Sequence, residues 1–211
     1  LGRTHWADTN RVMLRNRRIG CSVSGVAQFI TNRGLDEFRD WLEGGYDTIQ
    51  DWDKVYSDWF AIPRSIKTTS VKPSGTVSLL AGATPGLHYP ESRFYIRRIR
   101  VSKHSELLEP MKKAGYKIEP AFGSEDTTMV VEVPVDVGEG IRTAAELSIW
   151  EQFSLAAFLQ RHWADNQVSC TVTFNPETEG DSIPNVLNYF QYHLKGISLL
   201  PRHDWGAYPQ M

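Results

Sequence analysis

Cysteine is scarce in this sequence, and long apolar runs are missing altogether. Only two of the 211 residues are cysteines, Cys21 and Cys170, and they lie far apart in the chain. This spacing excludes a CxxC metal site and a disulfide framework, and it favours a reducing, cytoplasmic setting. No stretch approaches the roughly 18 to 20 apolar residues of a membrane helix, so no membrane partner is expected.

Neither sign of charge dominates. Lysine and arginine number 23 against 25 aspartates and glutamates, which gives a formal net charge of −2. Nucleic-acid-binding domains usually carry a clear basic excess, so nucleic acid is not an expected partner. Hydrophobic residues make up 41% of the chain and charged residues 23%, as in an ordinary folded protein and unlike a disordered one.

The common signatures of several enzyme classes are also missing. The six histidines contain no HxxxH or HExxH pair for a metal, and neither the GxSxG elbow nor the GxxxxGK[ST] loop occurs. His88 is the one histidine in a glycine- and proline-rich stretch, and we expect a structural role for it. We therefore assign no catalytic residue and no metal ligand within this chain.

Hydrophobic periodicity predicts alternating helices and strands. One helical region is expected over residues 34–60 with a break at Gly44-Gly45, and another after a capping box formed by Thr143 and Glu146. Five strands are expected, a short one over residues 68–72 and others over residues 94–101, 127–135, 167–174 and 197–200. Most connections are too long for hairpins. We predict an α/β fold with some parallel pairing, and no domain boundary within residues 1–211.

The strand expected over residues 94–101 carries arginines on both faces. Arg97 and Arg98 are neighbours, so they point to opposite faces and at most one of them enters a given site. The simplest interpretation is a pair of solvated or ion-paired side chains on a half-exposed strand.

The strongest local signal for chemistry is the stretch from Val71 to Leu80, VKPSGTVSLL. A strand runs into a tight turn and then into an apolar stretch of helical length, whose first backbone N–H groups lack partners. Gly75 would let a ligand approach the backbone, and the hydroxyls of Ser74, Thr76 and Ser78 could donate hydrogen bonds. This arrangement predicts a phosphate-binding turn, although a capped helix without a ligand is an open alternative.

The two cysteines have surroundings typical of structural thiols. Cys21 lies among small residues and is expected to be packed, and Cys170 alternates with valines in a strand. A buried thiol without a nearby base is inert.

Several motifs together resemble the adenosylcobalamin-dependent ribonucleoside-triphosphate reductases, the class II ribonucleotide reductases. The PSGT turn also occurs in other reductase classes, and the sequence from Ala81 to Arg100 is what favours the cobalamin-dependent class. The resembling segments are NRRIG at 16–20, VKPSGTVSLLAGATPGL at 71–87, FYIRRIR at 94–100, WADNQVS at 163–169, KGISLLP at 195–201 and AYPQ at 207–210.

The resemblance implies a ten-stranded α/β barrel, with residues 1–211 as its C-terminal portion. It implies reduction of ribonucleoside triphosphates to deoxyribonucleotides by thiyl-radical chemistry that adenosylcobalamin starts, with a thioredoxin-like or other dithiol reductant. By the same resemblance, Ser74, Gly75, Thr76 and Val77 hold the substrate phosphates through backbone N–H groups.

The chain also departs from the family pattern. The NPCGE-type loop that carries the family's radical cysteine does not occur, and neither Cys21 nor Cys170 falls on a catalytic position. We therefore expect a piece of a longer polypeptide that is inactive alone. The alternatives are a segment of another ribonucleotide reductase class, a non-catalytic nucleotide-phosphate-binding module, or a purely structural remnant.

Overall fold

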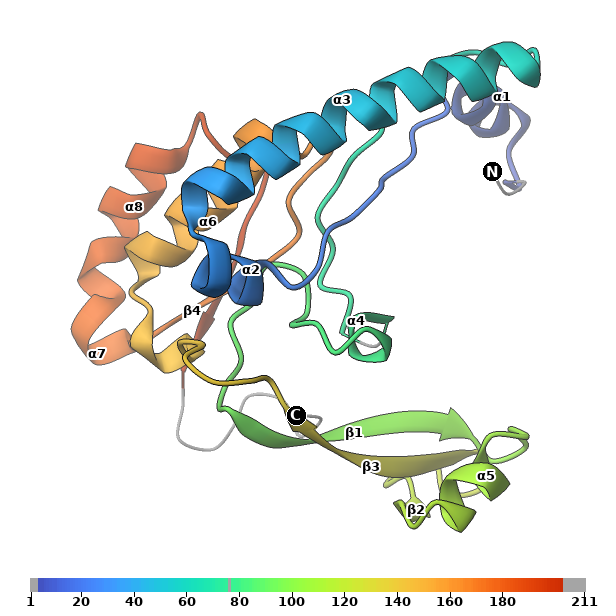
Figure 1. Cartoon of the computed structure of the whole chain (residues 1–211), viewed down its shortest axis with the longest axis vertical. Coiled ribbons are helices and arrows are strands. Elements are labelled where there is room, and N and C mark those ends of the chain that lie inside the picture. Colours follow the sequence, from blue (N-terminus) through green and yellow to red (C-terminus); the bar gives the residue numbers. More distant parts are fainter. Residues whose placement is uncertain (1–3, 76, 203–211) are drawn as a thin grey trace.

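The computed structural model describes residues 4–75 and 77–202, and it confirms the α/β class (Figure 1). Helices and strands alternate along much of this length, with two 3-10 turns between them. In chain order the elements are α1 (Ala7–Asn16), α2 (Val26–Arg33), α3 (Leu35–Trp59), α4 (Val77–Leu80), β1 (Phe94–Ser102), α5 (Leu108–Lys113), β2 (Lys117–Pro120), β3 (Thr128–Asp136), η1 (Ala144–Glu146), α6 (Ile149–His162), β4 (Thr171–Phe174), α7 (Pro176–Glu179), η2 (Gly180–Ser182), α8 (Ile183–Phe190) and β5 (Ser198–Pro201).

Four extended segments lie side by side in parallel. β4 pairs with β5 from Thr171 opposite Ser198 to Phe174 opposite Pro201. Two isolated parallel bridges extend this arrangement, one joining Val71 to Val168 and the other joining Cys21 to Thr69. Helices fill the connections between these segments, as parallel pairing requires. The expected parallel pairing is thereby confirmed.

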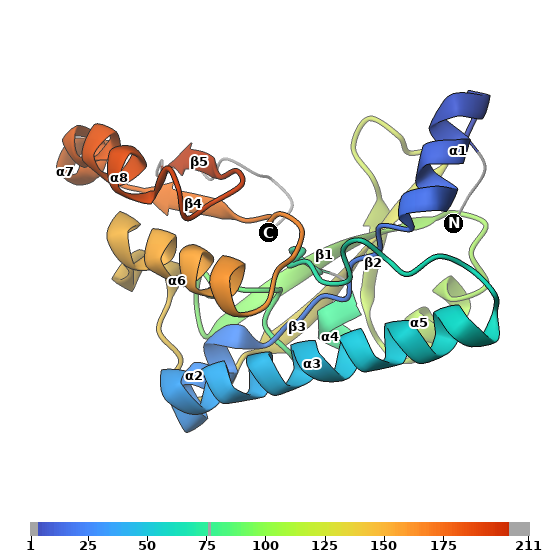
Figure 2. The same cartoon turned by 90° about the horizontal axis from the view of Figure 1, so that it is seen from above.

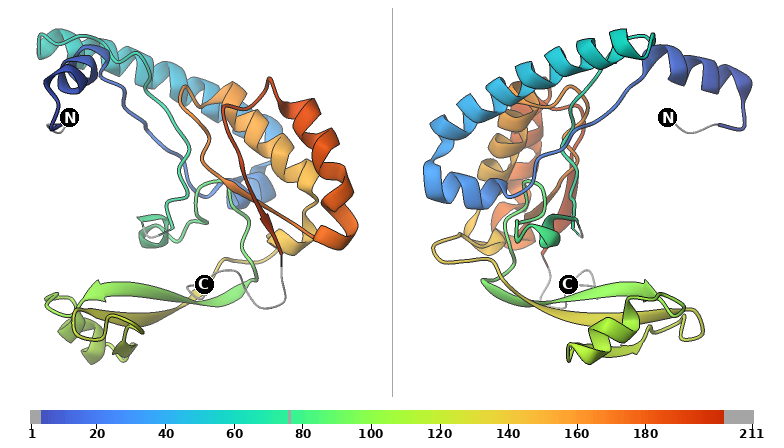
Figure 3. Two further views of the ribbon diagram at one scale, coloured as in Figure 1. Left: turned by 180° about the vertical axis from the view of Figure 1, so that it is seen from behind. Right: turned by 45° about the vertical axis from the view of Figure 1, so that its right-hand side comes forward.

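The core lies between these parallel segments and the helices. The strand expected over residues 167–174 turns one face inward, since Val168, Cys170, Val172 and Phe174 are all buried. α6 supplies the facing side chains and lies between α3 and α8 (Figures 1 and 3). Burying such apolar side chains is the main favourable contribution to folding.

α3 is one continuous helix of 25 residues, so the break expected at Gly44-Gly45 is wrong. Glycine inside a helix costs about 1 kcal/mol relative to alanine, but here one of the pair has a packing role. A Cβ atom at Gly45 would lie 3.3 Å from Cζ3 of Trp163. The glycine therefore makes room for a large side chain that follows α6, and Figure 2 shows α6 beside α3 from above.

Two capping boxes precede the long helix of the C-terminal half, and only one was expected. Thr143 and Glu146 form the expected box, but it opens the short 3-10 turn η1. α6 begins at Ile149 behind a second box, formed by Ser148 and Glu151. With this start of α6, Trp150 is 38% exposed.

A separate antiparallel sheet has the order β1-β3-β2. Its long pair, β1 and β3, matches the two strands predicted over residues 94–101 and 127–135 to within one residue at each end, with Arg97 opposite Val133. This sheet extends away from the helical layer (Figures 1 and 3). It therefore forms a hairpin arm beside the parallel segments.

Within the described residues, no helix combines the length and the apolar character that crossing a membrane requires.

Candidate phosphate-binding site

The PSGT turn (residues 73–76) follows a buried strand end. Val71 is fully buried in the parallel arrangement, and the chain then emerges at the exposed residues Lys72 and Pro73. The Lys72 N–H donates to Oγ of Ser22 at 2.9 Å, which fixes the point of departure. Thr76, one of the predicted phosphate-binding residues, lies outside the described residues, and Val77 is 70% exposed.

Ser74 holds the turn in an unusual backbone conformation. Its φ of 54° is in the left-handed region, which costs about 1–2 kcal/mol for a residue other than glycine. Its carbonyl oxygen accepts two hydrogen bonds from Ser78, one from the N–H at 3.2 Å and one from the hydroxyl at 2.6 Å. The Ser78 hydroxyl is buried and engaged in this bond, so the expectation that it could donate to a ligand is wrong.

α4 is a single turn, so the expected apolar stretch of helical length is also wrong. The Ala81 and Ala83 N–H groups both donate to the Ser78 carbonyl, and the chain reverses at Gly82 with a φ of 62°. Because so few peptide dipoles are aligned, this helix adds little positive potential to the turn. Any anion at the turn depends mainly on backbone N–H groups and on nearby cations.

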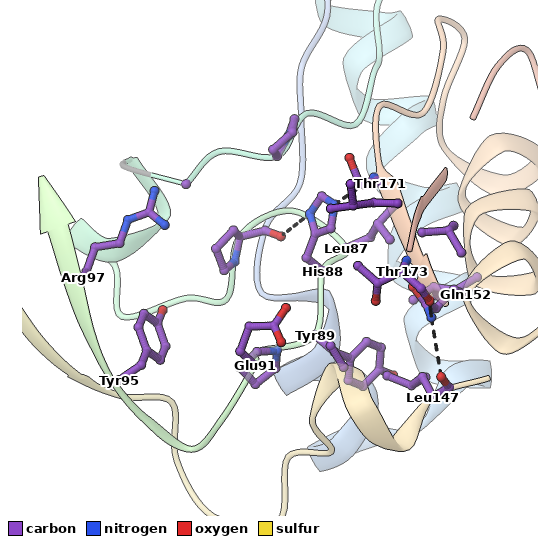
Figure 4. Close-up of a pocket in the computed structure, with 18 residues that line it drawn as sticks. Leu87, His88, Tyr89, Glu91, Tyr95, Arg97, Leu147, Gln152, Thr171 and Thr173 are labelled. Carbon is purple, nitrogen blue, oxygen red and sulfur yellow. Dashed lines mark hydrogen bonds between the residues drawn. The ribbon is translucent and has the colours of Figure 1, made fainter. Parts of the chain in front are cut away.

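A cavity of about 380 Å³ opens beside the turn (Figure 4). The turn, the loop 85–91, β1, α6, β4 and β5 all contribute to its walls. The lining residues are Pro73, Gly75, Pro85, Leu87, His88, Tyr89, Pro90, Glu91, Tyr95, Arg97, Ala144, Leu147, Gln152, Leu155, Thr171, Val172, Thr173 and Leu200.

Close backbone contact holds the loop 82–88 against the turn. Gly86 has a φ of 53°, and a Cβ atom there would lie 2.5 Å from the Lys72 carbonyl oxygen. The Gln28 side chain of α2 clamps the same loop, donating to the Gly82 carbonyl at 3.0 Å and accepting from the Thr84 N–H at 2.8 Å. No sequence pattern indicated Gln28, because it is distant from the loop along the chain.

His88 has the structural role expected of it. Its Nδ1 lies 3.3 Å from the Pro85 carbonyl oxygen, and its Nε2 accepts a hydrogen bond from the Thr171 N–H at 3.2 Å. Burial lowers the pKa of His88, which keeps the ring neutral. The histidine thereby ties the loop to β4 across the cavity.

Arg97 and Arg98 separate to opposite faces of β1, as predicted. Arg98 pairs with Glu119 of β2 and Glu132 of β3. Arg97 reaches the PSGT turn instead, because a Cβ atom at Gly75 would lie 2.8 Å from its Nη2 atom. The sequence showed that only one arginine could enter a site, but strand alternation alone could not show which face turns toward residues 73–76.

The two cysteines differ in exposure. Cys170 is buried in the helical core, where desolvation raises the pKa of its thiol to about 12. Its neighbours Thr171 and Thr173 face the cavity instead, as alternation in a strand requires. Cys21 is exposed, so the expectation that it would be packed is wrong. Its backbone forms the bridge to Thr69 at the outer edge of the described parallel segments.

No cluster of three or more His, Cys, Asp or Glu side chains suited to a metal occurs within residues 4–75 and 77–202. What the site does offer is a glycine turn, a guanidinium against that turn and a cavity beside both. This combination suits an anionic ligand, since backbone N–H groups and arginine are both common partners of phosphate oxygens.

Comparison with known proteins gives several strong similarities, although no family model matches the chain. An adenosylcobalamin-dependent ribonucleoside-triphosphate reductase of Euglena gracilis is 61% identical over 207 residues, which cover 98% of this chain and 28% of the relative. A probable enzyme of the same name from Dictyostelium discoideum is 60% identical and covers 100% of this chain and 28% of its own length. The Levilactobacillus brevis enzyme is 38% identical over 93% of this chain.

A solved structure is similar as well. The crystal structure of a B12-dependent, class II ribonucleotide reductase superposes with a TM-score of 0.79 at 33% identity, covering 97% of this chain and 32% of the other. This chain thus spans less than a third of the length of the relatives that it matches. The resemblance seen in the sequence motifs is confirmed: over nearly its whole length, this chain is similar to a segment of the adenosylcobalamin-dependent, class II ribonucleotide reductases.

Proposed function

We propose that residues 1–211 are the C-terminal portion of the catalytic barrel of an adenosylcobalamin-dependent ribonucleoside-triphosphate reductase, without an internal domain boundary. The four parallel segments form part of the wall of a ten-stranded α/β barrel. Their order supports this, because helices lie in the connections between them and the cavity is lined by β4, β5 and the PSGT turn. The similarity to the solved class II reductase supports the same arrangement.

Within that enzyme, Ser74, Gly75, Thr76 and Val77 hold the phosphates of a ribonucleoside triphosphate through backbone N–H groups. The observation that carries this assignment is the position of Gly75, on the cavity wall and against the guanidinium of Arg97. Thr76 enters the proposal through the resemblance alone. The alternative of a capped helix without a ligand fits the turn less well, since α4 is a single turn and needs little capping.

The complete enzyme converts ribonucleoside triphosphates to deoxyribonucleotides in the cytoplasm, without nucleic acid or a membrane as partner. Adenosylcobalamin, when bound, supplies the radical that starts the reaction, and a thioredoxin-like or other dithiol reductant supplies electrons. The cysteines of this chain do not fit that chemistry. Cys170 faces the helical core with a raised pKa, and Cys21 lies outside the cavity lining. The contribution of this chain is substrate binding and barrel wall.

Gly75→Val in the full-length polypeptide tests the phosphate site. A branched side chain at this position blocks the approach of phosphate to the backbone, so we expect KM for the ribonucleoside triphosphate to rise by a factor of about 30 to 100. That range corresponds to about 2–3 kcal/mol for the loss of charge-assisted hydrogen bonds.

Gly44→Val is the matched control, because Gly44 is exposed and nothing lies within 4 Å of its Cβ position. Circular dichroism checks that both variants fold. An unchanged KM in a folded Gly75→Val protein would contradict the phosphate role of the turn.

A further inference from the structure

The cavity beside the PSGT turn has one strongly basic side chain among the described residues that line it. Tyr95 and Arg97 project from the same face of β1 into the cavity, at the opposite end from Gln152 and Thr173 (Figure 4). His88 is kept neutral by burial, and Glu91 is the acidic lining residue. The positive charge of the cavity is therefore concentrated at Arg97, next to Gly75.

Two neighbouring arginines, one in β1 and one just before it, are used in ion pairs. Arg98 pairs with Glu119 and Glu132, while Arg93 pairs with Asp136 and Glu139. Within residues 4–75 and 77–202, no carboxylate pairs with Arg97, and its cross-strand neighbour Val133 is apolar. A half-buried guanidinium directed at a turn and a cavity gains most from an anion, because each N–H···O bond to a charged oxygen is stronger than one to water.

The turn alone provides little positive charge to balance the charge of a phosphate chain. Its N–H groups carry only partial charges, and the single-turn helix α4 adds a small dipole. A nucleoside triphosphate carries about one more negative charge than the diphosphate near neutral pH. A guanidinium, with its planar set of donors, can compensate this additional charge.

We propose that Arg97 binds the outermost phosphate of the substrate and makes this site prefer ribonucleoside triphosphates to diphosphates. The inference rests on the proposed phosphate-binding role of the turn. Because Arg97 lies at the end of the cavity remote from β4, a substrate whose phosphates reach the turn brings its terminal phosphate nearest to this side chain (Figure 4). Arg97 is thus a specificity-determining residue, and the backbone of the turn binds the phosphates that both substrates share.

The test compares Arg97→Gln with wild type in the full-length polypeptide, with ribonucleoside triphosphate and diphosphate of the same base. KM for the triphosphate is expected to rise by a factor of about 10 to 50, as for loss of a bidentate charged contact. KM for the diphosphate and kcat with either substrate should change by less than a factor of about 3. Arg97→Lys should recover part of the loss, since it keeps the charge but not the planar donors.

Arg100→Gln is the matched control, because Arg100 is exposed and lies on the other face of the same strand. Inhibition by inorganic triphosphate gives a second readout that does not depend on turnover of the substrate. Its inhibition constant should rise in Arg97→Gln, while that of inorganic diphosphate stays near the wild-type value.

The possible results separate this inference from the proposed function. If Arg97→Gln keeps the wild-type KM for triphosphate while Gly75→Val does not, the inference is wrong and the phosphate-binding turn stands. Wild-type KM values in both variants would overturn both the inference about Arg97 and the proposed phosphate-binding role of the turn. Equal losses for triphosphate and diphosphate would refute the role in selectivity. Should Arg97→Gln not fold, the same comparison is made with Arg97→Lys. Its KM values for triphosphate and diphosphate, and its inhibition by inorganic triphosphate, then decide the question.

Discussion

At the scale of single residues, the site depends on places where backbone approaches backbone. Gly86 and Gly82 both have positive φ, at 53° and 62°, and both belong to the loop that borders the cavity. They differ in their surroundings. A Cβ atom at Gly86 meets the Lys72 carbonyl oxygen at 2.5 Å, whereas nothing lies within 4 Å of a Cβ atom at Gly82. Substitutions at these two glycines therefore separate the free-energy cost of the left-handed conformation from the cost of a steric clash.

Gly86→Ala should destabilise the protein more than Gly82→Ala. Each change costs about 1 kcal/mol for the left-handed conformation, and the collision with backbone at residue 72 adds about 2 kcal/mol at Gly86 alone. Urea unfolding of both variants in the full-length polypeptide measures the difference. Equal unfolding free energies would mean that the loop is not pressed against the turn as described.

Arg97 shows where prediction from sequence ends at this scale. The alternation of β1 placed Arg97 and Arg98 on opposite faces, and the structure agrees. The choice of Arg97 for the cavity follows from how the arm lies against the turn, and that depends on contacts distant in sequence. The same applies to Gln28, whose side-chain clamp on the loop 82–84 has no local signal.

At the scale of elements, the beginning of α6 is set by electrostatics. Glu151 accepts hydrogen bonds from the Ser148 N–H at 2.9 Å and from Arg142 at 2.8 Å. The Arg142 guanidinium and the Ser148 N–H together lower the pKa of Glu151 from 4.5 to about 2. A carboxylate with a depressed pKa in the folded state stabilises that state above its ordinary pKa, and this stabilisation is lost as the pH falls toward 2.

Glu151→Gln should therefore lower the unfolding free energy near neutral pH, by about 1 kcal/mol for a partly exposed capping pair. The difference from wild type should shrink as the pH is lowered through the range between 4.5 and about 2. Thermal unfolding across this range measures it, with Glu106→Gln in an exposed turn as the control. A difference that grows toward acid would contradict the assigned role.

Sequence patterns predicted elements best where the pattern itself is the cause of the structure. The alternation of β1, the apolar β-branched residues of β3 and the capping box at Thr143 are examples. Prediction failed where packing overrode a local rule. Gly44-Gly45 predicts a break, yet α3 is continuous and Trp163 packs against Gly45. The apolar residues after the PSGT turn predicted a longer helix than α4, which reverses at Gly82.

At the scale of the whole molecule, the described parallel segments have open sides. Within the part of the chain that the structure describes, no strand pairs with the outer edge of β5 or with the outer edge at Cys21. The second half of α3 also exposes the aromatic side chains of Trp52, Tyr56 and Trp59. Unpaired edges and apolar patches of this kind favour association.

The 211-residue chain by itself should therefore associate and should form no deoxynucleotide. The proposed reaction needs a radical cysteine and a separate dithiol, whereas this chain has only two cysteines and one is buried in the core. The assay supplies adenosylcobalamin, ribonucleoside triphosphate and a dithiol under anaerobic conditions, with the full-length polypeptide as the positive control. Deoxynucleotide above the no-protein background would place the chemistry within these residues.

The most direct test of the central claim is a crystal structure of the full-length polypeptide with a ribonucleoside triphosphate bound. We expect phosphate oxygens within about 3.2 Å of backbone N–H groups of the turn at Gly75 and Val77, with the Arg97 guanidinium at the terminal phosphate. Phosphates bound elsewhere in the barrel, with the turn and Arg97 free of substrate, would contradict the role proposed for this segment.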